Sequence, residues 1–144
     1  MLTTLVTAEP EHSLEEPPGQ PWAVRRAAGP DGRPALEIYA ADALVDVLVL
    51  PTGWPLSPRI VRGAYAATWA GQRCAAAWGV LPSAGQAVAV QFSRGRIRSQ
   101  ACPAEPVAIG GVFWFAQAAG RFRHVLVTHR SRQERHGIRP ARPC

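Results

Sequence analysis

Hydrophobic and polar residues alternate along several short stretches of the chain, most clearly in QAVAVQF. Val88, Val90 and Phe92 recur there at every second position. Because successive side chains of a β-strand point to opposite faces of its sheet, this spacing predicts a strand whose three large side chains lie inward. The outward side chains are expected to be Ala89, Gln91 and Ser93. The next residues, SRGR, predict a turn, with Ile97 beginning a return strand.

Residues 22–40 predict a β-hairpin. Its turn is PDG at 30–32, where proline presets φ, the aspartate side chain caps the backbone and glycine accepts a positive φ. On the second strand Leu36 and Ile38 share one face. The opposite face carries Glu37 and Tyr39.

Two segments are harder to assign. The segment ALVDVLVLP, residues 43–51, predicts a strand buried on both faces, with a short helix starting at Asp42 as the alternative. In residues 60–82 the many alanines favour helix, but Gly63, Gly71 and Gly79 interrupt every helix of useful length. We therefore predict two strands joined by a turn at AGQ, and helix stays the alternative.

Strands are also predicted in the C-terminal half. After a loop at CPAEP, VAIGGVFWFAQ reads as one buried, aromatic-rich strand, residues 107–117. A turn at AAG then leads to RFRHVLVTH, in which Val125 and Val127 share a face.

Short strands separated by turn signals every 8 to 12 residues are typical of antiparallel all-β folds. The sequence therefore predicts an antiparallel β-sandwich, immunoglobulin-like or barrel-like, with little or no helix. Three parts are expected: an extended acidic, proline-rich arm (1–21), the β domain (22–130) and a basic C-terminal tail (131–144).

Charge is distributed unevenly along the chain. The formal net charge is +6, yet the first 46 residues hold eight of the ten acidic residues. All 16 basic residues are arginine, which we attribute to a GC-rich bacterial coding sequence rather than to phosphate recognition. The N-terminus lacks a signal-peptide pattern and no apolar run reaches membrane-spanning length, so we expect a cytoplasmic protein without membrane contact.

Three widely spaced cysteines match neither a disulfide framework nor a metal clip. We expect Cys74 and Cys102 to be reduced and mostly buried. His124 and His129 are five residues apart, so on one strand they point to opposite faces, and no metal site is predicted. No nucleophile-elbow, phosphate-loop or dinucleotide-binding motif occurs, so no catalytic residue and no cofactor are predicted.

Arginines are the main candidate binding residues. Arg94, Arg96 and Arg98 surround the predicted turn at Gly95 and form either a solvated hairpin surface or a surface for an anionic or acidic partner. The tail adds further candidates, Arg130, Arg132 and Arg135.

Tryptophans supply the remaining candidate. Trp69, Trp78 and Trp114 are expected in the core. Trp54, in the loop PTGWPLSP, is a candidate exposed anchor, and packing over a sheet end is its alternative.

These features favour a non-catalytic accessory or structural module. It would bind a protein partner, or itself, through a basic sheet face and the Trp/Pro-rich loop. A nucleic-acid-binding protein using the hairpin and tail arginines is the alternative, possible but not favoured, because no exposed aromatics interleave with the arginines. An enzyme whose site is dispersed in sequence is a third hypothesis.

Overall fold

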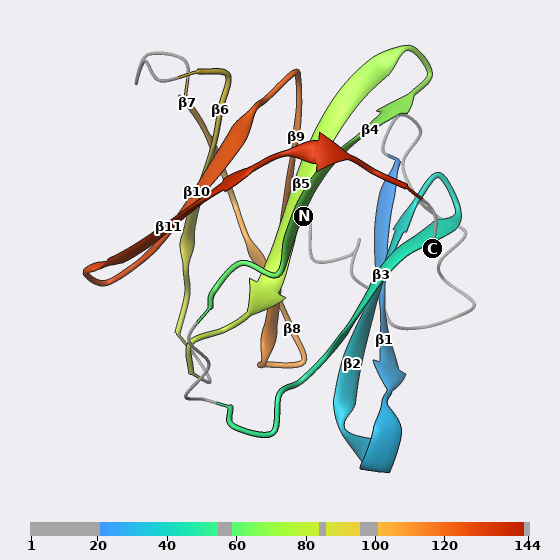
Figure 1. Ribbon diagram of the computed structural model, residues 1–144, viewed down its shortest axis with the longest axis vertical. Helices are drawn as coiled ribbons and strands as arrows, with labels where there is room; N and C mark the ends of the chain where they lie inside the picture. The colour runs from blue at the N-terminus through green and yellow to red at the C-terminus, as the bar shows by residue number, and fades with distance from the viewer. Residues whose placement is uncertain (1–20, 55–58, 84–85, 96–100, 143–144) are drawn as a thin grey trace.

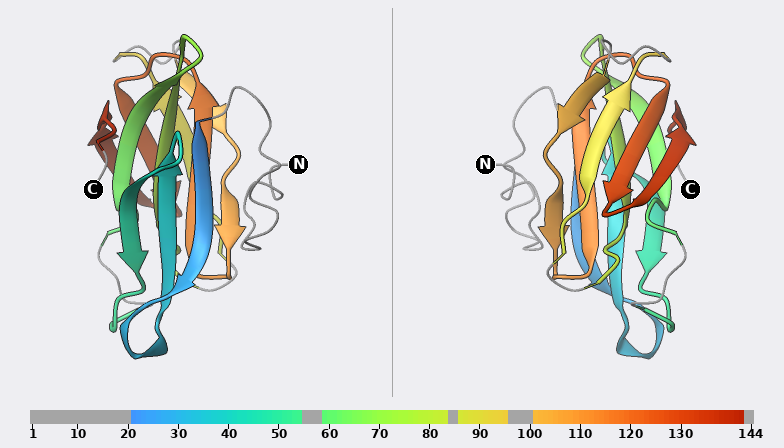
Figure 2. Two further views of the ribbon diagram at one scale, coloured as in Figure 1. Left: turned by 90° about the vertical axis from the view of Figure 1, so that its right-hand side faces the viewer. Right: turned by 90° about the vertical axis from the view of Figure 1, so that its left-hand side faces the viewer.

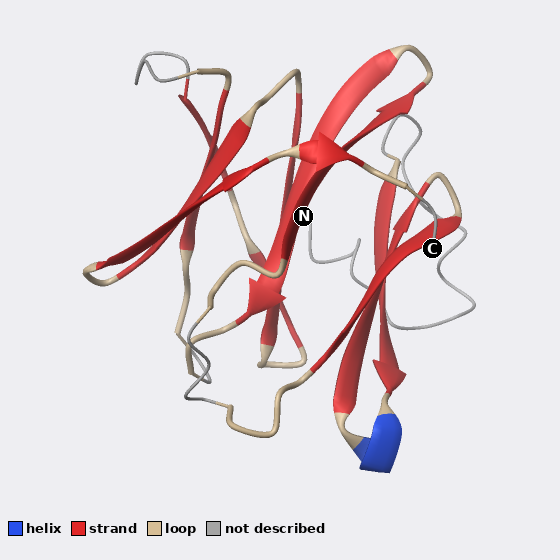
Figure 3. Ribbon diagram, viewed as in Figure 1, coloured by secondary structure: helices blue, strands red, loops and turns tan. Residues whose placement is uncertain are grey.

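A computed structural model describes residues 21–54, 59–83, 86–95 and 101–142. Within these ranges the chain forms twelve strands in three sheets, and its helical content is a single 3-10 turn at Pro30–Gly32 (Figure 3). In this described part no helix is long and apolar enough to cross a membrane. The all-β, mostly antiparallel class predicted from the sequence is confirmed. Each sheet has two open ends in the described ranges, so the barrel-like alternative is wrong.

The first sheet has the order β1-β2-β3. Its strands are β1 (Trp22–Ala28), β2 (Pro34–Ala40) and β3 (Ala43–Val49). The predicted hairpin is confirmed, and Leu36 and Ile38 are completely buried. The prediction for β3 holds only in part, because Val47 is 39% exposed. Ala41 and Asp42 both have positive φ, so Asp42 lies in a tight turn and begins no helix.

The central sheet has the order β12-β4-β5-β9-β8, with β12 parallel to β4 and the other pairs antiparallel. Its strands are β4 (Gly63–Trp69), β5 (Gln72–Val80), β8 (Val107–Ile109), β9 (Phe113–Ala119) and β12 (Arg139–Pro140). The predicted strand pair in residues 60–82 is confirmed over helix. The single strand predicted for 107–117 is wrong: Gly110 and Gly111 have positive φ, and the N–H of Val112 donates to Ile109 O at 3.3 Å, which closes a turn.

The third sheet has the order β11-β10-β6-β7. Its strands are β6 (Ala89–Ser93), β7 (Ala101–Ala104), β10 (His124–His129) and β11 (Arg132–Gly137). Val90 and Phe92 lie inward, as the alternation predicts. The predicted return strand at Ile97 lies outside the described residues. The partner of β6 is instead β7, whose Cys102 and Pro103 we had expected in a loop.

The segment predicted as a C-terminal tail differs most from expectation. β11 pairs with β10 over six residues, and β12 pairs with β4 in the central sheet. Residues 132–140 therefore contribute strands to two sheets. A stretch rich in arginine gave no hydrophobic alternation by which to recognise these edge strands.

The three sheets stack as layers with the central sheet in the middle (Figures 1 and 2). One core lies between the central and third sheets, and a second lies between the central and first sheets. β5 serves both, since its Ala75 and Ala77 face the first of these cores while Ala76 and Trp78 face the other. This explains why its sequence lacks polar residues between Cys74 and Val80.

The segment immediately before β4 connects all three layers. Ile60 O accepts a hydrogen bond from Trp114 Nε1 of the central sheet (3.0 Å). The backbone N–H of Ile60 donates to Glu134 of the third sheet (2.9 Å). Arg62 pairs with Asp46 of the first sheet at 3.2 Å. Of the predicted core tryptophans, Trp78 and Trp114 are fully buried, but Trp69 is 39% exposed, so that prediction was wrong.

Candidate functional site

A hollow with a volume of about 800 Å³ lies on the outer face of the third sheet. We call it the outer groove. All four strands of the sheet contribute to it, so it is a feature of the whole sheet face. Its lining residues are Ala89, Gln91, Ser93, Gly95, Ala101, His124, Leu126, Thr128, Gln133 and Arg135.

Strand alternation places these side chains. Val90 and Phe92 of β6 point into the core, so the residues between and beside them point outward. The register then sets Gln91 opposite Leu126, and Leu126 opposite Arg135. The outward orientation predicted for Ala89, Gln91 and Ser93 is thereby confirmed.

Arg135 and His124 are neighbours in the outer groove and contribute to its electrostatics. Arg135 Nη2 lies 3.4 Å from His124 Nδ1. A guanidinium has only donors, so Arg135 is the donor in this contact. His124 adds a polar edge to the groove, and Arg135 supplies a positive charge.

No carboxylate is among the described residues that line the outer groove. Glu134, although next to Arg135 in sequence, points to the opposite face of β11 and accepts from the backbone of Ile60 and Val61 at 2.9 Å. Arg132 is on that same side, 3.0 Å from Glu134. The groove is therefore polar and positive, without an internal counter-charge.

The predicted site arginines do not gather in one place. Arg135 lines the groove, whereas Arg132 is on the other face and Arg130 is in the β10–β11 turn with positive φ. Arg94 is exposed just after β6 and does not line the groove; its Cζ is 5.7 Å from the centre of the Phe122 ring. Arg96 and Arg98 lie outside the described residues.

Trp54 is half-buried rather than a free anchor. Its Nε1 donates to Leu81 O at 2.7 Å, and its ring packs against the core between the first and central sheets. Of the two interpretations of this residue, packing over a sheet end describes its position.

Sequence reasoning missed His124, Leu126 and Thr128 as groove residues. The signal was present, because Val125 and Val127 were predicted to share one face of their strand, and both are fully buried. Their neighbours had to point outward, beside Gln91 and Ala89 of the adjacent strand. What alternation could not supply was the pairing of β10 with β6, since 30 residues separate the two strands.

Two other groups of titratable residues are structural in character. On the outer face of the first sheet, Arg25 and Tyr39 both donate to Glu37, at 2.7 Å each. Burial by itself raises the pKa of Glu37, but these hydrogen bonds outweigh it and hold that pKa below its usual value.

Burial raises the pKa of the Cys74 thiol to about 11, which leaves this thiol unreactive at neutral pH.

Within the described residues no three His, Cys, Asp or Glu side chains gather as a metal site would require. Searches among protein-family models, curated proteins and solved structures each return no match to this chain.

Proposed function

We propose that this chain is a non-catalytic interaction module that binds an acidic protein partner in the outer groove. The observation that carries the proposal is the groove itself: a hollow of about 800 Å³ across four strands, whose described lining combines polar and small apolar residues with one arginine and includes no carboxylate. Concave surfaces with a few convergent polar groups are the usual form of a binding site. Among the described residues, Arg135 is the one predicted arginine that lines this groove, and the proposal assigns the charged contact to it.

The chemistry of the lining favours an extended acidic segment. Gln91, Gln133 and Thr128 offer both donors and acceptors, which suits a peptide backbone. Leu126 at the centre provides an apolar contact, and Arg135 provides a partner for a carboxylate. The Trp/Pro-rich loop is left out of the proposed surface because the Trp54 indole N–H is already bound.

The finer fold type and the location belong to the same proposal. The third and central sheets face each other across one core, which supports an antiparallel sandwich of immunoglobulin-like kind with the first sheet added behind it. Cys74 and Cys102 are both free thiols, which supports a cytoplasmic location.

Chemical-shift mapping tests the proposed partner class. Uniformly ¹⁵N-labelled protein would be titrated with a hexaglutamate peptide and, separately, with a mixed-sequence single-stranded oligonucleotide. We expect the peptide to shift the amide signals of Gln91, Leu126 and Gln133. The Arg135→Ser variant should weaken peptide binding at least fivefold, because it removes the arginine among the described lining residues.

Arg139→Ser is the matched control, since Arg139 is exposed on β12 of another sheet. It should change peptide affinity less than twofold. Equal losses in both variants would indicate net-charge attraction and would contradict a specific groove. Tighter binding of the oligonucleotide, weakening steeply with salt, would support the nucleic-acid alternative instead.

A further inference from the structure

The outer face of the first sheet is not covered by any described element. The left view of Figure 2 shows this sheet as the layer nearest the viewer. On β1 and β2 the side chains that alternate with the buried Trp22, Val24 and Leu36 point to this face, and the register adds their neighbours on β3. The outward side chains that are at least partly exposed are Ala23, Arg25, Ala27, Glu37, Tyr39, Leu44, Val47 and Val49. They belong to neither of the two cores.

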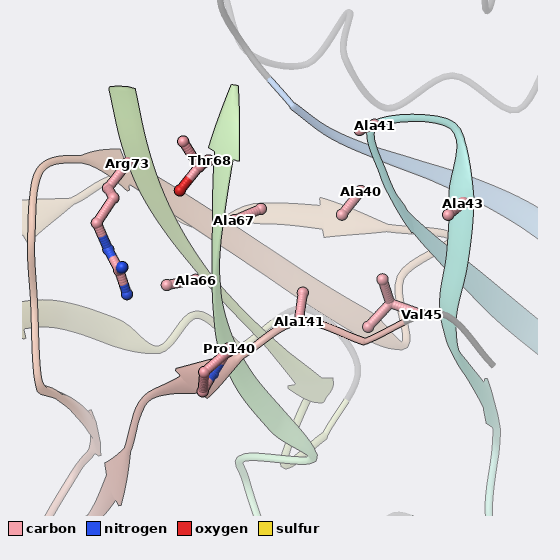
Figure 4. A pocket seen from close by; sticks show the side chains of 10 residues that line it. All are labelled: Ala40, Ala41, Ala43, Val45, Ala66, Ala67, Thr68, Arg73, Pro140 and Ala141. Atoms are coloured by element: carbon pink, nitrogen blue, oxygen red, sulfur yellow. The ribbon is translucent and has the colours of Figure 1, made fainter. Parts of the chain in front are cut away.

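A β-bulge in β3 determines which of its side chains reach this face. The pairing of β2 with β3 shifts between Ile38 and Tyr39, and the residue left without a partner there is Val45. Val45 instead lines a hollow of about 370 Å³ between β3 and β4, as Figure 4 shows. Because the bulge inserts one extra residue, Leu44 and Val47 can both point outward although they are three residues apart. Val47 is 39% exposed, so a large apolar side chain is open to solvent on this face.

The charges on this face balance, although the whole chain carries a formal net charge of +6. Arg25 and Glu37 are the charged residues among the outward side chains, and they lie opposite each other in the register of β1 and β2. Arg25 Nη2 is 2.7 Å from Glu37 Oε1. Two copies of a basic chain repel each other in general, whereas this face adds no net repulsion when it meets a copy of itself.

The two charged groups each keep one atom without a hydrogen bond in the described part of the chain. Glu37 Oε1 accepts from Arg25 and from the Tyr39 hydroxyl, and no described donor reaches Glu37 Oε2. Arg25 donates through Nε and Nη2, which leaves Nη1 unused. A free donor and a free acceptor on one face make that face self-complementary, since a twofold axis can bring the Arg25 Nη1 of each copy to the Glu37 Oε2 of the other.

We propose that two copies of this chain associate through the outer faces of their first sheets. The aliphatic side chains of the two faces interdigitate, as in other pairs of stacked sheets, and the two Arg25–Glu37 pairs combine midway along the strands. Three strands of seven residues outline roughly 340 Å² on each copy, less than half of the about 800 Å² per partner in stable complexes. The dimer is therefore weak and reversible.

This dimer leaves the outer groove open. The groove is on the third sheet, and the central sheet separates that layer from the first. Two outer grooves are then present on one particle, so a partner with repeated acidic segments would bind to both and gain avidity. The dimer itself is independent of what the groove binds.

Analytical ultracentrifugation of the full-length protein from about 10 µM to about 1 mM tests the dimer, because an interface of this size requires high concentrations. We expect the weight-average mass to rise from that of one chain towards that of two. Val47→Arg places like charges in the symmetric contact and should weaken association at least tenfold. Gln133→Arg is the matched control, because it adds the same charge on the third sheet, and it should weaken association less than twofold.

Charge reversal provides a second test, whose readout is a gain of association. Arg25→Glu leaves two carboxylates on each face and Glu37→Arg leaves two guanidinium groups, so each variant alone should stay monomeric. An equimolar mixture of the two variants should form a dimer, because every acidic face then meets a basic one. This recovery would also show that both variants are folded.

A wild-type protein that stays monomeric at about 1 mM would overturn the proposal. So would equal weakening by Val47→Arg and Gln133→Arg, which would indicate net-charge repulsion or a contact through the third sheet. A mixture of the charge-reversed variants that stays monomeric, with both folded by circular dichroism, would overturn it as well. None of these outcomes bears on the outer groove, which the peptide titration tests separately.

Discussion

Ile60 crosses β5 so closely above Gly79 that no side chain fits between them. A Cβ added at Gly79 would overlap Ile60 O and lie 2.8 Å from Trp114 Nε1, and a hydrogen bond of 3.0 Å holds these two groups together. Gly79→Ala should therefore lower the free energy of unfolding by about 3 kcal/mol or more. Urea denaturation measures this. Gly53→Ala is the control, because no atom lies within 4 Å of its added Cβ, and its cost should stay within about 0.5 kcal/mol. Similar midpoints for both variants would contradict the close approach.

The two described thiols should differ in reactivity. Cys74 is buried in the core between the first and central sheets, with a pKa of about 11, whereas Cys102 is half-buried. A thiol reagent at pH 8 should label Cys102 well before Cys74, as mass spectrometry would show. The expectation that both are mostly buried thus holds for Cys74 alone. Rapid labelling of Cys74 in the native protein would contradict its position.

The raised pKa of Cys74 also affects stability. The unfolded chain loses this proton near the ordinary thiol pKa of 9.0, while the folded protein retains it to a pKa of about 11. The contribution of Cys74 is therefore fully present below pH 9 and is lost as the pH rises towards 11. Denaturation midpoints of the wild-type protein and of Cys74→Ala, compared at pH 8 and pH 10.5, should show the larger alkaline loss in the wild type. Equal losses of stability in the two proteins between pH 8 and pH 10.5 would contradict the raised pKa of Cys74.

At this scale the sequence predicts the inward residues of alternating strands well and isolated residues poorly. Phe92 and Val90 were assigned correctly because alternation needs no knowledge of partners. Trp69 was assigned to the core, but it is the last residue of β4, next to a tight turn, and is 39% exposed. Gly79 was recognised only as a helix breaker, because the residue that crosses above it is 19 positions away.

At the scale of the elements, one carboxylate joins β11 to the segment before β4. Glu134 accepts the N–H groups of Ile60 and Val61 at 2.9 Å and so joins β11 to the segment before β4. Glu134→Ala should lower the free energy of unfolding by about 2 to 4 kcal/mol, since two backbone donors lose a charged acceptor. Chemical denaturation measures it. Gln133→Ala, on the opposite and exposed face, should change stability by less than about 0.5 kcal/mol. If this segment were a tail without a structural role, Glu134→Ala and Gln133→Ala would lower the free energy of unfolding by equal, small amounts.

Turn chemistry explains which elements were predicted. PDG and AGQ signal their turns through proline and glycine, and both turns are where the sequence places them. The turn at Ala41 and Asp42 has positive φ at both residues, and it contains neither glycine nor proline to mark it in the sequence. The glycine pair at 110 and 111 was read as part of a strand, because flanking hydrophobic residues continue on both sides. The outer groove is built by pairing between strands far apart in the sequence, and the local alternation of residues does not predict such pairing.

At the scale of the whole molecule, the two cores share their middle layer, and this should make unfolding a single transition. β5 and β9 contribute to both cores, so neither can open without exposing the other. Phe92→Ala in one core should cost about 3 to 5 kcal/mol, and Leu36→Ala in the other about 2 to 5 kcal/mol. Both should shift one common transition, with tryptophan fluorescence and far-ultraviolet circular dichroism coincident. Val47→Ala, on the exposed side of β3, should cost less than about 1 kcal/mol. If Leu36→Ala instead produced an early transition that leaves the Trp114 signal unchanged, the first sheet would be a separate folding unit, and the shared middle layer would not couple the two cores.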